Sequence, residues 1–85
     1  MTAAEKTPYS VVMTAYNEEE WVAAAVASVL GQTHQELRLI LVDDGSSDGT
    51  VAAVEPFRSD PRLHVIQQPN AGLSAARNTG IAAAG

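Results

Sequence analysis

The sequence contains no cysteine, and only five of its 85 residues are lysine or arginine. Without cysteine the chain can form neither a disulfide framework nor a thiolate metal site, and this composition fits a reducing compartment. Ten aspartates and glutamates outweigh the basic residues, so the formal net charge is −5. A chain with so few cations is poorly suited to a phosphate backbone, and nucleic acid is therefore not an expected partner.

Long apolar runs are also missing. Residues 1–8 form a polar N-terminal lead that includes Glu5 and Lys6 and has no apolar core of signal-peptide length. No apolar stretch approaches the ~20 residues that cross a bilayer, so we expect a soluble, cytoplasmic chain without a membrane segment. The composition is that of a globular protein, with 46% hydrophobic and 18% charged residues, and the length suffices for one small domain.

Blocks of apolar residues predict strands and helices in turn along the chain. β-Branched and aliphatic runs predict buried strands at 9–15, 37–42 and 63–67. Helical spacing of the apolar residues predicts helices at 18–31, after residue 48 and at 73–84. This β-α-β-α-β-α order predicts an α/β fold with a parallel sheet and right-handed crossovers.

Two of the predicted helices carry specific capping signals. Asn17 is a good N-cap for the first helix, and Glu20, three positions on, completes a capping box. Trp21 falls on the apolar stripe of the same helix and is expected in the core. Asp48 is expected to cap the second helix, which Pro56 should kink or end because proline lacks an amide hydrogen.

The most informative segment is LRLILVDDGSSDGT at 37–50, an apolar strand that ends in two adjacent aspartates. Carboxylates at the carboxyl end of a buried parallel strand lie where open α/β sheets bind ligands. A dinucleotide site would also need a glycine-rich turn after the first strand, and TAYNEEE contains no glycine. A calcium loop of the EF-hand type matches residues 44–55, but a strand and not a helix precedes it. A purely structural turn is the third alternative.

Three motifs in a fixed order point beyond these alternatives. They are SVVMTAYNEEEWV at 10–22, LILVDDGSSDGT at 39–50 and QQPNAGLSAARNTGI at 67–81. Together they closely resemble the N-terminal part of family 2 glycosyltransferases, whose GT-A fold is a Rossmann-like nucleotide-diphospho-sugar transferase domain, and the resemblance covers residues 9–85. It implies an enzyme that transfers a sugar, with inversion, from a nucleotide-diphosphate donor to an acceptor hydroxyl. The donor nucleoside in this family is usually uridine.

The resemblance implies donor-binding roles for residues after the first strand. Thr14, Ala15 and Tyr16 would line the base pocket, and Tyr16 would stack on the base or pack beside it. Glu18 would contact the ribose or the base. Each side chain also has a structural alternative, since Tyr16 could simply pack against the chain and Glu18 could be a partner for the helix dipole.

Three further residues receive roles from the same resemblance. Asp44 would accept a hydrogen bond from the base or the ribose, and Asp43 would support the loop. Arg77 would lie near the donor from the third helix, although it could equally be a solvated helix residue. These positions complete a candidate substrate-binding set of seven residues.

The catalytic parts of the family would follow this chain. A carboxylate base and an Asp-x-Asp motif that holds Mg²⁺ or Mn²⁺ are expected after a fourth strand. We therefore expect residues 9–85 to be the N-terminal part of the domain, truncated before the fourth strand, with no catalytic residue and no metal ligand. Such a chain should be marginally stable and inactive, with its first strand at an exposed sheet edge. The alternative is a non-catalytic nucleotide-sugar-binding module or a truncated inactive product. The residues identify neither the sugar nor the acceptor.

Overall fold

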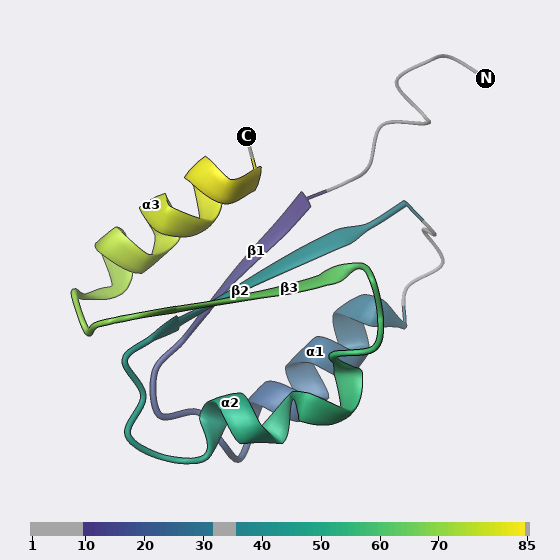
Figure 1. Cartoon of the computed structure of the whole chain (residues 1–85), viewed down its shortest axis with the longest axis horizontal. Helices are drawn as coiled ribbons and strands as arrows, with labels where there is room; N and C mark the ends of the chain where they lie inside the picture. The colour runs from purple at the N-terminus through teal and green to yellow at the C-terminus, as the bar shows by residue number, and fades with distance from the viewer. Residues whose placement is uncertain (1–9, 32–35, 85) are drawn as a thin grey trace.

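The computed structural model describes residues 10–31 and 36–84, which form a single α/β unit (Figure 1). Its elements, in chain order, are β1 (Ser10–Ala15), α1 (Val22–Leu30), β2 (Arg38–Asp44), α2 (Thr50–Ala53), the 3-10 helix η2 (Glu55–Phe57), β3 (Leu63–Gln68) and α3 (Leu73–Ala84). The alternation of strands and helices is the predicted one, and α3 has the predicted bounds.

The three strands form one parallel sheet in the order β1-β2-β3. Ser10 pairs with Arg38 at the start of β1, and Leu39 pairs with Leu63 at the start of β3. The central position of β2 explains its nearly continuous apolar run, because a strand with neighbours on both sides and helices on both faces meets little water. Within the described residues β1 lies at a sheet edge, as expected.

Helices cover both faces of the sheet, with α1 and α2 on one face and α3 on the other (Figure 1). Side chains of β2 alternate between these two layers. Leu39 and Leu41 pack with α1 and with Val54, which follows α2, whereas Ile40 and Val42 pack with Ala76 of α3. The sheet therefore has a core on each face, and its carboxyl end is where the connecting loops gather.

Helix α3 lies unusually close to the sheet at Gly80. A Cβ atom on this residue would lie 2.3 Å from Cγ1 of Val12 and 3.2 Å from Cγ2 of Val42. Real side chains do not approach so closely, so the absence of a side chain at position 80 permits the observed packing distance.

Several predictions about local structure are wrong. Helix α1 begins at Val22 instead of residue 18, and Asn17 does not cap it, because Asn17 has a positive φ of 53° and bonds to a different loop. Trp21 is 68% exposed, since the buried stripe of α1 consists of Val22, Val26 and Leu30. The second strand does not end at residue 42 as predicted, because β2 continues through both aspartates to Asp44.

The second helix is short, as the proline in its sequence predicts. The α-helical part has only four residues and ends at Ala53. The chain then tightens into η2, with Pro56 in its first turn. Proline fits the first turn of a helix but not its interior, because it has no amide hydrogen to donate.

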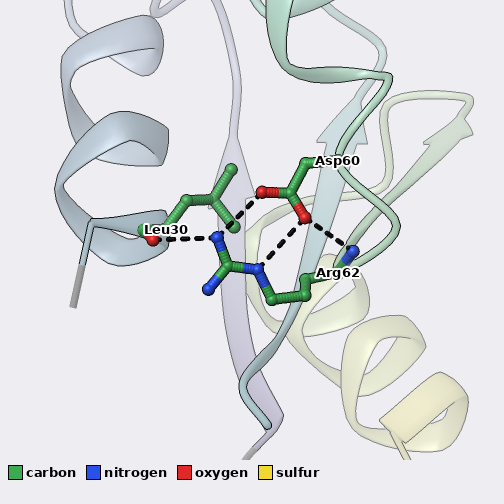
Figure 2. A network of polar contacts seen from close by, with 3 residues as sticks. All are labelled: Leu30, Asp60 and Arg62. Carbon is green, nitrogen blue, oxygen red and sulfur yellow. Dashed lines mark hydrogen bonds and ion pairs between the residues drawn. The ribbon is translucent and has the colours of Figure 1, made fainter. Parts of the chain in front are cut away.

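A charged pair connects α1 to the loop that leads into β3 (Figure 2). The Arg62 guanidinium donates to both carboxylate oxygens of Asp60, at 3.1 and 2.8 Å, and to the backbone oxygen of Leu30 at 2.9 Å. The side-chain hydrogen bonds from Arg62, followed by that from its backbone amide, lower the pKa of Asp60 to about 2. The contact to Leu30 satisfies a carbonyl at the end of α1, which has no partner within the helix.

No helix in the described part of the chain has the length and apolar character needed to cross a membrane.

Candidate functional site

A pocket of about 230 Å³ opens at the carboxyl ends of β1 and β2. It is lined by residues from three separate segments, namely Thr14, Ala15, Tyr16, Glu18, Asp44, Asn70, Gly72, Leu73 and Ala76. The carboxyl ends of parallel strands are where open α/β sheets bind ligands, because the loops there diverge and leave a crevice. This position makes the pocket the candidate functional site.

Five of the seven predicted substrate-binding residues line this pocket. They are Thr14, Ala15, Tyr16, Glu18 and Asp44. Tyr16 is 50% exposed, so it is not a core tyrosine. The other two predicted residues lie outside the lining: Asp43 is buried beneath the loop, and Arg77 is exposed on α3 next to Ala76. The structure brings the five together from two segments, and their roles toward a ligand stay predictions.

Asp43 connects the turn after β2 to the loop after β1. Its carboxylate accepts hydrogen bonds from the Ser46 amide, at 3.2 Å, and from the Ser46 hydroxyl, at 2.5 Å. The Ser46 hydroxyl in turn accepts a hydrogen bond from the Asn17 amide at 2.8 Å. Asn17 also contacts the turn through its side chain, since its Oδ1 accepts a hydrogen bond from the Ser47 amide at 2.8 Å. Asp43 thus supports the loop after β1 indirectly, because Ser46 bonds to both Asp43 and Asn17.

Asp48 and Thr50 make a second connection of the same kind. The Thr50 hydroxyl donates to Oδ1 of Asp48 and accepts from the Glu18 amide at 2.8 Å. Asp48 also accepts from the Thr50 amide at 2.9 Å and from the Glu19 amide at 3.3 Å. These hydrogen bonds, that of the Thr50 hydroxyl first, hold the pKa of Asp48 below its ordinary value. Asp48 is not the predicted cap of α2, because Gly49 is the N-cap residue and no side chain caps this helix.

The two connections explain why the loop after β1 needs no regular structure to be well positioned. Backbone amides of three consecutive residues, 17 to 19, donate to side chains of the turn at 46–50. Both Tyr16 and Glu18 line the pocket. The backbone amide of Glu18 is itself hydrogen-bonded to the turn, and Tyr16 is positioned by the hydrogen bond of the next amide, that of Asn17. Their side chains remain exposed toward solvent.

Asp44 is the third acidic residue at this end of the sheet, and it holds the loop after β3. Its Oδ1 accepts from the Gln68 side chain at 3.0 Å and from the Ala71 amide at 2.9 Å. Its Oδ2 accepts from the Gly72 amide at 2.9 Å and from the Asn70 side chain at 3.4 Å. The hydrogen bond from Gln68, followed by that from Ala71, holds the pKa of Asp44 below its ordinary value. Asp44 is therefore ionised at neutral pH. Its side chain is nevertheless buried, since the residue is only 4% exposed.

Sequence reasoning missed the loop after β3 as part of the site. Asn70, Gly72, Leu73 and Ala76 all line the pocket. The signal was present, because an Asn-Ala-Gly loop follows the third strand and the carboxyl ends of parallel strands meet at one edge. The missing step was to place this loop beside Asp44, which requires the sheet order.

Neither the calcium alternative nor a catalytic metal centre finds its ligands in the described ranges. A strand enters the aspartate turn, whereas an EF-hand needs a helix there. Across residues 10–31 and 36–84 no three His, Asp or Glu side chains lie together in a way that could hold a metal ion. The acidic side chains 43, 44 and 48 instead bind amides and hydroxyls of the chain itself. These residues thus do not fit a catalytic divalent ion.

Comparison with known proteins decides the family. The profile described as "Glycosyl transferase family 2" matches residues 10–85, which include the whole described site. The chain belongs to glycosyl transferase family 2. This membership confirms the resemblance of the three motifs, and the parallel three-stranded sheet agrees with one half of the family's Rossmann-like domain.

Family 2 relatives of this chain include proteins from several bacteria. The chain is 42% identical over 76 residues to a protein of Bacillus subtilis (strain 168) described as "Uncharacterized glycosyltransferase EpsJ", covering 88% of this chain and 22% of the relative. It is 38% identical over 73 residues to glycosyltransferase GlyA of Streptococcus pneumoniae serotype 4, with 85% and 10% covered. It is 36% identical over 73 residues to chondroitin synthase of Escherichia coli, with 85% and 11% covered.

This family 2 chain therefore spans between a tenth and a quarter of the length of these relatives. The matched region is the described α/β unit with its pocket. General glycosyl transfer is the shared activity of the family.

Proposed function

We propose that this chain forms the nucleoside-binding half of the donor site of an inverting glycosyltransferase. The donor is a nucleotide-diphosphate sugar, with uridine as the expected nucleoside, and the acceptor contributes a hydroxyl group. We also propose a cytoplasmic location, because the cysteine-free composition fits a reducing compartment.

One observation carries the proposal. The pocket at the carboxyl ends of β1 and β2 is lined by five residues that the family resemblance assigns to donor binding, from two segments about 30 residues apart in the chain. A volume of about 230 Å³ is below the usual range for whole drug-sized ligands. It suits a nucleoside more than a complete sugar nucleotide, which agrees with a half site.

The side chains at the rim suit a nucleoside. Tyr16 is half exposed and offers an aromatic face on which a base can stack; such stacking contributes about 1–3 kcal/mol per base. Glu18 is exposed beside it and offers carboxylate oxygens to ribose hydroxyls or to a base N–H. Thr14 and Ala15 line the pocket at the end of β1. The carboxylate of Asp44 already has four donors, so we propose that it mainly supports the opposite wall.

The chemistry of sugar transfer needs further groups. In this family a divalent Mg²⁺ or Mn²⁺ would stabilise the leaving diphosphate, and no cluster in the described ranges fits that ion. The residues of this chain bind and orient the nucleoside in our proposal. The expectation that the 85-residue chain alone is inactive stays a prediction. A sugar-transfer assay with UDP-sugars and added Mg²⁺ or Mn²⁺ tests it, and metal-dependent turnover would contradict it.

A titration of the isotope-labelled chain with uridine diphosphate tests the binding proposal. We expect saturable NMR shifts at residues 14–18 and 70–73, and weaker shifts with adenosine diphosphate. Glu18→Gln should weaken binding about tenfold, because a hydrogen bond to a charged group is lost. Glu20→Gln is the matched control, since Glu20 carries the same group nearby but does not line this pocket. The proposal fails if uridine diphosphate causes no saturable shift, or if the two variants bind equally.

A further inference from the structure

We propose that Gln68 and Thr79 are positioning residues for this pocket, which act through Asp44 on the loop at residues 69–72. Neither side chain lines the pocket. The consequence for ligand affinity rests on the proposed function, whereas the consequence for the loop does not.

A chain of hydrogen bonds runs from α3 to the pocket wall. Thr79 Oγ1 lies 2.7 Å from Oε1 of Gln68, the last residue of β3. Nε2 of Gln68 donates to Oδ1 of Asp44, the last residue of β2, at 3.0 Å. Each member thus belongs to a different element, and the chain crosses the end of the sheet.

The carboxylate determines the direction of every bond in this chain. An ionised carboxylate only accepts hydrogen bonds, so Gln68 must turn its amide NH₂ toward Asp44. Its carbonyl oxygen then faces Thr79, whose hydroxyl must donate to it. The alternative orientation of the amide would place two acceptors against each other. The Ala75 carbonyl lies 3.0 Å from the same hydroxyl, farther away than Gln68.

The other side of Asp44 holds the loop that forms the wall. The amides of Ala71 and Gly72 each donate to one carboxylate oxygen at 2.9 Å. Asn70 adds a hydrogen bond of 3.0 Å from its side chain to the Asp44 carbonyl. Gly72, whose φ of 98° is in the left-handed region, is followed directly by α3. The negative carboxylate therefore also lies at the helix N-terminus, where it is favoured.

These contacts leave the orientation of Asp44 dependent on Gln68. The carboxylate has about four acceptor positions. Two of them face the amides of the loop only while the side chain of Asp44 keeps its present orientation. Loss of the Gln68 donor leaves Oδ1 with a single partner, and loss of the Thr79 hydroxyl lets the Gln68 amide turn. Since Asn70, Gly72 and Leu73 line the pocket, a rotated Asp44 moves or loosens its wall.

The test compares two matched pairs of variants of this chain. Thr79→Val removes the hydroxyl and keeps the shape, whereas Thr79→Ser keeps the hydroxyl and should rescue. Gln68→Leu removes the donor to Asp44. Gln67→Leu is its control, because Gln67 is the preceding, exposed residue of β3 and its side chain points to the opposite face.

The first measurement needs no ligand. Amide hydrogen exchange at Ala71 and Gly72 should accelerate about tenfold in Gln68→Leu, as expected when a hydrogen bond to a charged group is lost. Thr79→Val should accelerate it less, and exchange at Leu41 in the core should not change. The pKa of Asp44 should rise toward its ordinary value in Gln68→Leu, because the hydrogen bond from Gln68 is the largest cause of its depression.

The second measurement is the affinity for uridine diphosphate, which should fall in Gln68→Leu and Thr79→Val and recover in Thr79→Ser. The inference is overturned if exchange at Ala71 and Gly72 is unchanged in Gln68→Leu, or if Gln67→Leu has the same effect. It is also overturned if the loop loosens but affinity stays at the wild-type value. A wild-type chain that binds no uridine diphosphate would refute the proposed function, while the exchange data would still decide the positioning role.

Discussion

A Cβ atom on Gly45 would lie 2.5 Å from the backbone nitrogen of Asn70. The turn after β2 and the loop after β3 therefore approach each other closely through their backbones, and Asn70 also lines the pocket. Gly45 also has a positive φ of 74°, which disfavours any residue with a side chain. Two separate constraints thus require glycine at this position.

Gly45→Ala should destabilise the chain and displace the loop at 69–72. We expect a loss of about 2–4 kcal/mol in unfolding free energy, from backbone strain of about 1–2 kcal/mol and a clash of similar size. Gly72→Ala is the matched control, because Gly72 has a positive φ but open space around a Cβ atom. Urea denaturation measures both variants. Equal losses would show that the contact with Asn70 contributes nothing.

Asn17→Ala should loosen the contact between the loop after β1 and the turn after β2. The variant loses the acceptor for the Ser47 amide and keeps a positive φ, so we expect a loss of about 1–2 kcal/mol. Asn17→Gly loses the same acceptor without the backbone strain and should cost less. Hydrogen exchange should accelerate at Ser47 and not in the first turn of α1. Loss of protection in that turn would support the helix-capping role that the structure contradicts.

The Asp60–Arg62 pair predicts a specific acid sensitivity. The pKa of Asp60 is lowered from 3.8 to about 2 in the folded chain. A lowered pKa means that the stabilisation is complete above pH 4 and is lost as the pH falls toward 2. Asp60→Asn should therefore be less stable than the wild type at pH 6, and this difference should shrink toward pH 2.

Thermal unfolding measured from pH 6 to pH 2 checks this dependence. Glu55→Gln is the control, because its ion pair with Arg58 is long, at 3.9 Å, and exposed to solvent. Such a pair contributes little to stability. Its removal should therefore leave the dependence of thermal stability on pH nearly unchanged. A constant difference between Asp60→Asn and wild type across this range would refute the assignment.

Gly80→Ala should destabilise the chain, although alanine is normally favoured over glycine in a helix by about 1 kcal/mol. The added methyl group would lie 2.3 Å from Val12, so α3 must move away from the sheet at a cost of about 1–3 kcal/mol. The double variant Val12→Ala with Gly80→Ala restores space and should recover part of this loss. Guanidinium denaturation of the wild type, the single variant and the double variant provides the measurement. A stabilised single variant would contradict the close packing of α3 against Val12.

Local sequence determines most of the secondary structure of this protein. The β-branched runs, the helical spacing and the glycine and proline positions predict six elements in the correct order, and α3 with its observed bounds. The nearly unbroken apolar run of β2 also indicates its central place in the sheet. These features depend on neighbours within a few residues, so the pattern alone is enough to predict them.

Trp21 and Asn17 show where local reasoning fails. Each has a plausible role in α1 that the structure does not show, and Asn17 instead contacts residues about 30 positions away. Asn17 binds Ser47 instead of capping the helix. Helix α1 begins at Val22, with Trp21 as its exposed N-cap residue. Propensity is a weak preference, and a pair of well-formed hydrogen bonds exceeds it.

The aspartates of β2 mark the boundary between the two kinds of information. The sequence alone places acidic groups at the carboxyl end of a buried strand and, through its three motifs, identifies the family. Only the tertiary structure shows that Asp43 binds Ser46 beneath the first loop, whereas Asp44 binds the amides of Ala71 and Gly72. The physical reason is that a buried carboxylate must find donors, and which donors it finds depends on the loops that the parallel sheet brings to the same edge.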